Sequence, residues 1–205
     1  MENINDAAHT LGVIDSAMNK LDELENVKYI DENGTDLKPT SYDIVFKNVS
    51  FGYDTRIVLH DLNFQIPQNT TTAIVGPSGS GKSTLCNLIA RFYDVNSGEI
   101  TLGGMDIRKF TCDSLLENIS MVFQNVYLFR DTIKNNIKFG SPDATDEQII
   151  AAAKAARCHD FIMALPDGYD TVIGEGGSSL SGGEKQRISI ARAMLKDAPI
   201  VILDE

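Results

Sequence analysis

The segment Gly76–Ser83, which reads GPSGSGKS, constrains this chain more than any other part of its sequence. It matches the phosphate-loop (Walker A) pattern G-x-x-x-x-G-K-[ST] at every fixed position. Its glycines let consecutive backbone N–H groups turn inward, where they can bind phosphate oxygens. Lys82 is predicted to reach the terminal phosphates of a nucleotide, and Ser83 to bind Mg²⁺. The alternative is a glycine-rich turn that only resembles this pattern.

The segments on either side of the loop favour the phosphate-binding interpretation. Thr71–Val75 is a β-favouring run, which we predict to be a strand that ends at Gly76. After the loop, apolar residues at i, i+3, i+4 and i+7 predict an amphipathic helix. They are Leu85, Leu88, Ile89 and Phe92. We therefore expect the nucleotide to contact Gly76, Pro77, Ser78, Gly79, Ser80, Gly81, Lys82, Ser83 and Thr84.

Strand patterns occur elsewhere in the chain. Apolar residues alternate from Ile44 to Phe51 with one slip, which predicts a strand with a bulge. Glu99–Ile107 contains Gly103-Gly104 and predicts a hairpin. Ile119–Phe123 is another candidate strand, and Pro199–Leu203 is predicted to be a fully buried one.

Helical patterns dominate between these last two strands. Thr145 followed by Gln148 is a capping-box start, which predicts a helix to about Arg157. His159–Leu165 predicts a further helix, so that residues 125–180 form a helical lobe. Another helix is expected from Ser181, with Ile188, Ala191 and Leu195 on one face.

The N-terminal segment has a different character. Residues 1–27 predict a helix whose apolar stripe consists of Leu11, Ile14, Met18 and Leu21. Two interpretations are equally open: a surface helix on the domain's own core, or the end of a longer helix from an upstream module. Asp31–Thr40 is polar and predicts a linker.

Composition excludes several classes of function. The 205 residues carry a net charge of −11, which argues against binding to a nucleic-acid backbone. No apolar run approaches the roughly 18–20 residues of a membrane-spanning helix, and the polar, acidic start does not resemble a signal peptide. The cysteines, Cys86, Cys112 and Cys158, lack metal-site spacing, so we expect reduced thiols.

The last residues provide a candidate second half of the phosphate site. Four apolar residues precede Asp204, so this acid is expected at a strand end, where ligands of α/β sheets bind. Asp204 is predicted to hold Mg²⁺ through water, and Glu205 to polarise the attacking water as the catalytic base. The alternative is a solvated strand end.

A third motif carries a family resemblance. Leu180–Gln186 reads LSGGEKQ and resembles the signature of ATP-binding cassette (ABC) proteins. Ser181, Gly182, Gly183 and Glu184 at a helix start form an anion site of open N–H groups. The resemblance implies that two such domains face head to tail and that each signature caps the partner's nucleotide.

The resemblance covers about residues 42–205 and adds further positions. Gln124 resembles the glutamine that touches Mg²⁺ and the attacking water, which implies a catalytic and metal-binding role. Tyr53 resembles the aromatic that stacks on adenine; the alternative is an ordinary edge-strand tyrosine. Leu128–Ile137 and Leu165–Glu175 are similar to exporter segments that contact the membrane domain. The sequence departs from the family where Glu184 replaces the more frequent glutamine and where Gly176-Gly177 replaces a common arginine.

The family implies an α/β fold: a P-loop NTPase (ABC ATPase) core with an N-terminal antiparallel β subdomain and a helical subdomain. Residues 1–41 are then a helical segment and linker from an upstream transmembrane domain, and residues 42–205 the ATP-binding domain. In the family, further strands and a histidine follow the catalytic glutamate, whereas His9, His60 and His159 precede it. We therefore expect a fragment with its C-terminal strands missing, inactive by itself.

The function implied is an ATP-binding and ATP-hydrolysing domain of an ABC exporter, with ATP and Mg²⁺ as cofactors. Its expected partners are a second nucleotide-binding domain, in a homo- or heterodimer, and the transmembrane domain, at the cytoplasmic face of the membrane. No nucleic-acid partner is expected. The alternatives are a soluble ABC ATPase of DNA repair or translation, or ATP binding without turnover. Soluble members carry long insertions, whereas the stretch from Gln124 to Ser181 has room only for a compact lobe.

Overall fold

The computed structural model describes residue 16 and residues 18–22, 30 and 33–204. The chain divides into two compact units, Met1–Glu32 and Asn33–Glu205. In the first unit, residues 16 and 18–22 are helical, and Met18 and Leu21 of the predicted stripe are exposed. The rest of that stripe, Leu11 and Ile14, lies outside the described residues. No helix in the described part is both long and apolar enough to cross a membrane.

The second unit begins within the predicted linker. The backbone N–H of Thr35 donates to the carbonyl of Lys109 at 2.9 Å, and the N–H of Thr111 donates to the carbonyl of Thr35 at 3.0 Å. A Cβ on Gly34 would lie 2.5 Å from the carbonyl oxygen of Phe110, so the two backbones touch here. Residues 33–41 therefore belong to the same compact unit as the rest of the fold.

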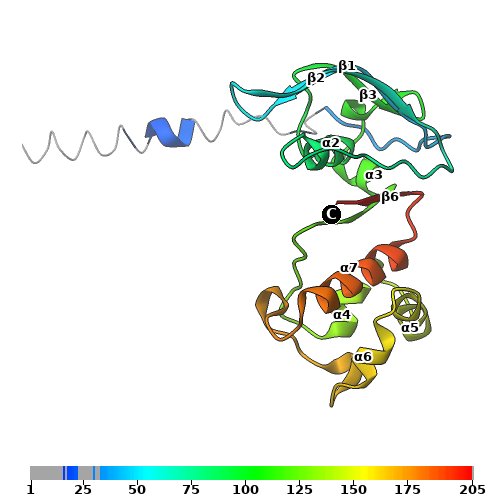
Figure 1. Cartoon of the computed structure of the whole chain (residues 1–205). Coiled ribbons are helices and arrows are strands. Elements are labelled where there is room, and N and C mark those ends of the chain that lie inside the picture. Colours follow the sequence, from blue (N-terminus) through cyan, green and yellow to red (C-terminus); the bar gives the residue numbers. More distant parts are fainter. Residues whose placement is uncertain (1–15, 17, 23–29, 31–32, 205) are drawn as a thin grey trace, which may run out of the picture. The chain divides into compact units, whose positions relative to one another are not determined.

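A four-stranded antiparallel sheet in the order β2-β1-β3-β4 forms one layer of this unit (Figure 1). Its strands are β1 Ile44–Gly52, β2 Ile57–Ile66, β3 Ser97–Leu102 and β4 Met105–Asp106. The bulge predicted in the first strand is confirmed by register shifts between Phe46 and Gly52. The predicted hairpin is confirmed too, because Gly103 and Gly104 have φ of 56° and 79° in the turn between β3 and β4.

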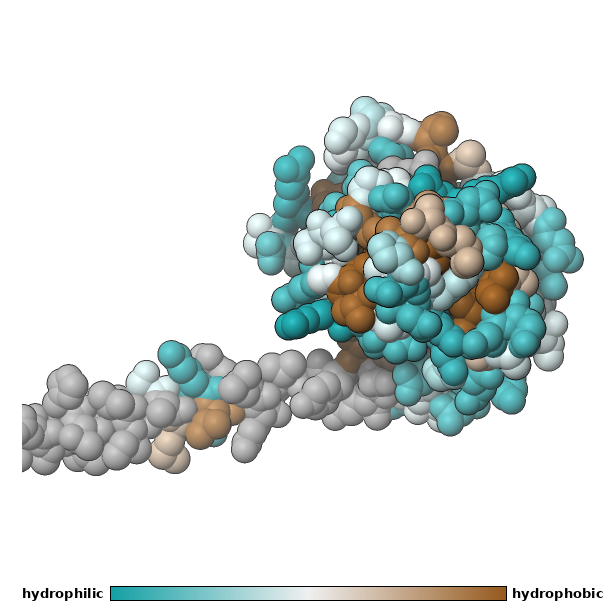
Figure 2. Space-filling view, turned by 90° about the horizontal axis from the view of Figure 1, so that it is seen from below, coloured by the Kyte–Doolittle hydropathy of each residue, from teal (hydrophilic) through white to brown (hydrophobic). Residues whose placement is uncertain are grey.

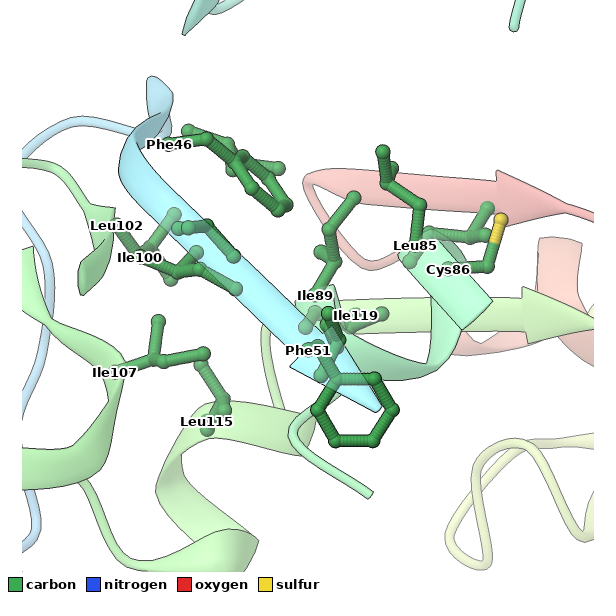
Figure 3. Close-up of a cluster of buried hydrophobic side chains, with 14 of the residues drawn as sticks. Phe46, Phe51, Leu85, Cys86, Ile89, Ile100, Leu102, Ile107, Leu115 and Ile119 are labelled. Carbon is green, nitrogen blue, oxygen red and sulfur yellow. The ribbon is translucent and has the colours of Figure 1, made fainter. Parts of the chain in front are cut away.

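The helix α2 (Lys82–Ile89) packs its apolar face against this sheet. Leu85, Leu88 and Ile89 are buried as predicted, but the helix ends at Ile89, and Phe92 is 36% exposed. Figure 3 shows Phe46 and Phe51 of β1, Ile100 and Leu102 of β3 and the α2 side chains in one cluster. The helices η1 (Ile107–Lys109) and α3 (Cys112–Leu116) extend the cluster through Ile107 and Leu115.

A separate two-stranded parallel sheet pairs β5 (Ile119–Val122) with β6 (Ile200–Leu203). Ile202 is buried, whereas Val201 and Leu203 are 58% and 62% exposed. The prediction of a fully buried last strand is therefore wrong. Within residues 33–204, β6 pairs with β5 alone, so one edge of β6 and much of its apolar surface stay uncovered.

The strand predicted at Thr71–Val75 is also wrong, because the structure has irregular backbone there. Ile74 and Val75 are 40% and 89% exposed. A strand needs a neighbour to receive its backbone hydrogen bonds, and no strand pairs with this segment in the described part of the chain. The β-favouring composition alone does not form the strand.

The helical lobe has its own apolar core. It contains α4 (Ile133–Lys138), α5 (Asp146–Ala155), α6 (His159–Met163), η2 (Gly168–Asp170), η3 (Glu175–Gly177) and α7 (Gly182–Lys196). The predicted capping box of Thr145 and Gln148 is present at the start of α5. The predicted lobe boundary at residue 180 is too early, because Ile188 and Ala191 of α7 are fully buried in this core.

The C-terminal end of α7 fastens the lobe to β5. Lys196 Nζ donates to the carbonyls of Leu116 and Ile119, each at 2.7 Å. Ser120 Oγ donates to the carbonyl of Ala193 at 3.2 Å. Burial lowers the pKa of Lys196, so part of its charge is desolvated at this junction. Because α7 is one continuous helix, these contacts near its C-terminal end also fix where its N-terminal end lies.

Candidate functional site

The loop Gly76–Ser83 enters α2 through glycines in left-handed backbone. Gly79 has φ of 79° and Gly81, the N-cap of α2, has φ of 91°. A Cβ on Gly81 would lie 2.7 Å from Cδ2 of Leu59. Both the backbone conformation and the available space therefore require glycine at this N-cap.

The N-terminal end of α2 is open to an anion. No side chain within the described residues caps it, and its first turn carries no acid. The first N–H groups of a helix have no partner inside the helix and carry partial positive charge. Lys82 Nζ donates to the carbonyls of Gly76 and Pro77, each at 3.0 Å, so its charge lies against the same loop. A group with several negative oxygens fits this arrangement.

Two predicted metal ligands meet beside the loop. Ser83 Oγ donates to Oδ1 of Asp204 at 2.8 Å, although 121 positions separate them. The N–H of Asp204 donates to the carbonyl of Val122 at 3.0 Å, which fixes the acid at the end of β6. Burial and then the charge of Asp204 raise the pKa of the Cys86 thiol, which keeps it protonated.

The donor set of this pair fits Mg²⁺, which prefers oxygen ligands and commonly takes one or two from protein together with phosphates and water. Among the described residues, no three His, Cys, Asp or Glu side chains gather as a metal site. The remaining ligands would come from phosphate, from water or from Gln124, which is also a predicted metal ligand.

Gln124 lies at the same edge as this pair. Because β5 and β6 run parallel with Val122 opposite Leu203, Gln124 and Asp204 follow the same ends of neighbouring strands. Gln124 is exposed, and no hydrogen bond within residues 33–204 joins it to Ser83 or Asp204. Glu205, the predicted base, lies outside the described residues.

Tyr53 lies next to the start of α2. Its hydroxyl donates to Oγ1 of Thr84 at 3.1 Å, and 47% of the residue is exposed. Its ring forms a T-shaped contact with Tyr93 at a centroid distance of 5.0 Å. The sequence pattern did not single out Tyr93, because aromatic residues near a helix end are common and only the fold brings these rings together.

The signature segment forms a capped helix start. Ser181 is the N-cap of α7, and Oε2 of Glu184 accepts from its N–H at 2.8 Å and from its hydroxyl at 2.7 Å. The hydroxyl of Ser181, then its N–H, and the charge of Arg187 hold the pKa of Glu184 below its ordinary value. Gly182 and Gly183 occupy the first helical positions, and a Cβ on Gly182 would meet nothing within 4 Å.

The phosphate loop and the signature lie in different parts of the fold. In Figure 1, α2 lies beside the antiparallel sheet, whereas α7 starts in the helical lobe, with β6 between the two. The structure therefore brings together Tyr53, Thr84, Lys82, Ser83 and Asp204, and leaves Ser181 apart from them.

Comparison with known proteins is consistent with this geometry. The family model described as ABC transporter matches residues 59–205. The chain is 54% identical over 171 residues to an ATP-dependent lipid A-core flippase of Desulfotalea psychrophila, which covers 83% of this chain and 30% of that protein. It is 54% identical over 164 residues to a putative multidrug export ATP-binding/permease protein of Bacillus subtilis, which covers 79% of this chain and 28% of that protein.

A solved structure of a bacterial Atm1-family ABC exporter with ATP bound has a TM-score of 0.86 and 44% identity, covering 96% of this chain and 35% of that one. The chain thus spans less than a third of the length of the curated relatives named above. A family match over most of the chain, joined to this fold similarity, leads to one conclusion: the chain belongs to the ABC transporter family and has the fold of an ABC ATPase.

Proposed function

We propose that this chain is the nucleotide-binding domain of an ABC exporter, which binds and hydrolyses MgATP at the cytoplasmic face of a membrane. The observation that carries the proposal is the uncapped start of α2, with Lys82 against its loop and the Ser83–Asp204 pair 2.8 Å apart beside it. This arrangement offers backbone donors and a lysine to phosphates and oxygen ligands to a cation.

Each residue then has a defined task. Residues 76–84 bind the phosphates, with Lys82 at the terminal ones. Ser83 and Asp204 would hold Mg²⁺, which would supply positive charge beside the phosphates. Gln124, which follows the neighbouring strand at the same edge, orients the attacking water, and Glu205 accepts a proton from that water. Tyr53 supplies an exposed ring for adenine.

The separation of the signature supports a site shared between two copies. Ser181 and the α7 start lie in the helical lobe, away from the phosphate loop of the same chain (Figure 1). A phosphate at Lys82 can meet a signature only if a second domain presents one. We therefore include a head-to-tail dimer, of identical or different chains, in the proposal.

The function is tested by ATP binding to the Lys82→Ala variant. Loss of a charge-assisted contact to phosphate costs about 1.5–3 kcal/mol, so ATP affinity is expected to fall by about 10- to 150-fold. Isothermal titration calorimetry measures it, with Lys138→Ala, a partly exposed lysine in the last turn of α4, as the control. Unchanged ATP affinity in Lys82→Ala would contradict the assignment of the loop.

An aromatic surface on the helical lobe is the proposed contact of the transmembrane domain. Tyr127, Phe129 and Phe139 are 53%, 42% and 62% exposed. The centroid of Phe129 lies 5.6 Å from that of Tyr127 and 4.9 Å from that of Phe139, and the guanidinium of Arg192 lies over both phenylalanine rings. Figure 2 shows that apolar residues reach the surface in several groups on one face. This surface includes part of the segment that resembles the exporter segments.

Substitution of a residue in this surface tests whether the transmembrane domain binds there. Phe139→Asp should weaken copurification of this chain with the separately expressed transmembrane domain, because a charge replaces an apolar contact. Met163→Asp, at a residue that is 57% exposed in the same lobe, is the matched control. Equal copurification of both variants with the transmembrane domain would place the contact elsewhere.

The alternative of a soluble ABC ATPase is disfavoured by the compact lobe between Gln124 and Ser181, which consists of short helices and turns without a long insertion in this stretch. If phosphate release by the complete transporter stays at background, the domain binds ATP without hydrolysing it.

A further inference from the structure

Three aromatic rings meet at the end of β1, beside the phosphate loop. The rings of Phe51 and Tyr53 form a T-shaped pair at 5.1 Å, and those of Tyr53 and Tyr93 form another at 5.0 Å. Phe51 and Tyr93 are tilted at 5.7 Å, so each ring touches both others. Phe51 is 3% exposed, whereas Tyr53 and Tyr93 are 47% and 43% exposed. The cluster thus has a buried base and two exposed members.

Hydrogen bonds hold the turn that carries Tyr93. Arg91, two residues before Tyr93, is 4% exposed, and its Nη1 donates to the carbonyls of Ile107 and Phe110 at 3.2 and 2.7 Å. Its Nε donates to Oδ1 of Asp94 at 3.0 Å, so the turn around Tyr93 is held on both sides. Tyr93 itself lies in the short connection from α2 to β3.

The same connection is tied to the end of β1. Oδ1 of Asn96 accepts from the N–H of Gly52 at 2.7 Å, and the N–H of Asn96 donates to the carbonyl of Ser50 at 3.1 Å. Gly52 immediately precedes Tyr53. The backbones that carry the two tyrosines are therefore fixed relative to each other.

Tyr53 is held at its other end by the helix of the phosphate loop. Its hydroxyl donates to Oγ1 of Thr84, which lies in the first turn of α2. An exposed tyrosine loses side-chain entropy when it is ordered against a ligand. A ring already held by its neighbours avoids much of that cost on binding.

We propose that Tyr93 is a positioning residue for nucleotide recognition: its ring holds the ring of Tyr53 in the orientation that stacks on a purine base. Neither aromatic neighbour is stacked parallel to Tyr53, and about half of that residue is exposed, so a planar base can reach it. The inference rests on the proposed function, because it assigns the base to Tyr53 and the phosphates to residues 76–84.

The test separates base binding from phosphate binding. ATP and inorganic tripolyphosphate are titrated into the chain and into Tyr93→Leu, Tyr93→Phe and Phe92→Leu, each by calorimetry. An aromatic pair contributes about 0.5–1.5 kcal/mol, so Tyr93→Leu should lower ATP affinity about two- to twelvefold. The affinity of Tyr93→Leu for tripolyphosphate should be unchanged, because residues 76–84 keep their contacts with phosphate.

Two variants control for structure. Tyr93→Phe keeps the ring and should restore ATP affinity. Phe92 is a neighbour of Tyr93 with similar exposure, at 36%, but its ring pairs with Phe123 at 6.1 Å, so Phe92→Leu should leave both affinities in place. Equal losses of ATP and tripolyphosphate affinity in Tyr93→Leu would show a general disturbance and overturn the proposal.

Tryptophan fluorescence provides a direct measurement of stacking at position 53. The chain has no tryptophan, so Tyr53→Trp provides a single reporter. ATP should quench its emission and tripolyphosphate should not, and Tyr93→Leu in this background should reduce the ATP quench. If ATP quenches Tyr53→Trp equally with and without Tyr93→Leu, the positioning role is overturned, while the proposed function is not contradicted. If the unsubstituted chain binds neither ligand, the proposed function falls as well.

Discussion

The starts of α2 and α7 are both proposed phosphate sites, yet they are built in opposite ways. α2 begins at a left-handed glycine, without a side-chain cap within residues 33–204 and without an acid in its first turn. α7 begins at Ser181, whose hydroxyl and N–H are engaged by Glu184 in a capping box. One helix start is open, and the other is closed by its own side chains.

The difference bears on how each start can bind an anion. At α2 a phosphate adds hydrogen bonds to N–H groups that have no partner in the helix. At α7 the carboxylate of Glu184 already accepts from the hydroxyl and N–H of Ser181, and this negative charge repels a phosphate that approaches the same helix start. We infer that α2 can bind nucleotide by itself, whereas α7 contributes only when a second domain already presents a bound phosphate.

The largest expected effect comes from giving α2 the acid of α7. Thr84 occupies the same helical position in α2 that Glu184 occupies in α7. Two like charges at about 4 Å near a protein surface repel by about 4 kcal/mol, so after partial screening Thr84→Glu should bind ATP about 100-fold more weakly than Thr84→Gln. Calorimetry on both variants measures the difference.

The glutamine variant is the control for size, since both substitutions remove the hydroxyl that accepts from Tyr53 and both enlarge a buried side chain. If the two variants bind ATP equally, charge at this helix start does not matter, and the contrast between α2 and α7 loses its basis.

An effect of intermediate size is expected from opening α7. Ser181→Ala removes the N-cap hydroxyl and should lower the free energy of unfolding by about 1 kcal/mol. Thr145→Ala removes the corresponding hydroxyl of the capping box of α5, outside the proposed sites, and should cost about the same. Urea unfolding compares the two. A cost at Thr145 without one at Ser181 would mean that α7 is as open as α2.

These helix starts also show what a sequence can predict. Both capping boxes and the hairpin of Gly103-Gly104 follow from residues that are near neighbours in the chain, because caps and turns are local hydrogen-bonding patterns. The capping box at Thr145 was predicted from that spacing alone. The phosphate-loop pattern is local in the same way, because it lies within eight consecutive residues that lead into the start of α2.

The predictions that were wrong, and the contact that was missed, concern segments whose structure depends on residues far away in the sequence. Thr71–Val75 has strand composition but no neighbouring strand in the described part of the chain, and β6 has apolar residues that no second neighbour covers there. Likewise, the contact of Tyr53 with Tyr93 arises because Asn96 ties the connection after α2 to β1. A pattern within one segment carries no information about such contacts.

The smallest expected effect is a dependence of stability on pH at α7. The hydroxyl of Ser181, its N–H and the charge of Arg187 lower the pKa of Glu184 in the folded chain. A carboxyl whose pKa is lowered by folding stabilises the fold above its unfolded pKa, and this contribution is lost as the pH falls through the folded value. The stability advantage of the chain over Glu184→Gln should therefore be present at pH 7 and shrink below about pH 4.5.

Urea unfolding of both proteins across this range measures the advantage, and repeating it in the Ser181→Ala background identifies its source. Because the hydroxyl of Ser181 is the largest cause of the lowered pKa, the pH dependence should become weaker there. A difference that stays flat with pH would mean that the carboxylate is not held on Ser181 in solution. The start of α7 would then be open to phosphate in the single chain, and the division of labour between the two helix starts would have to come from their positions alone.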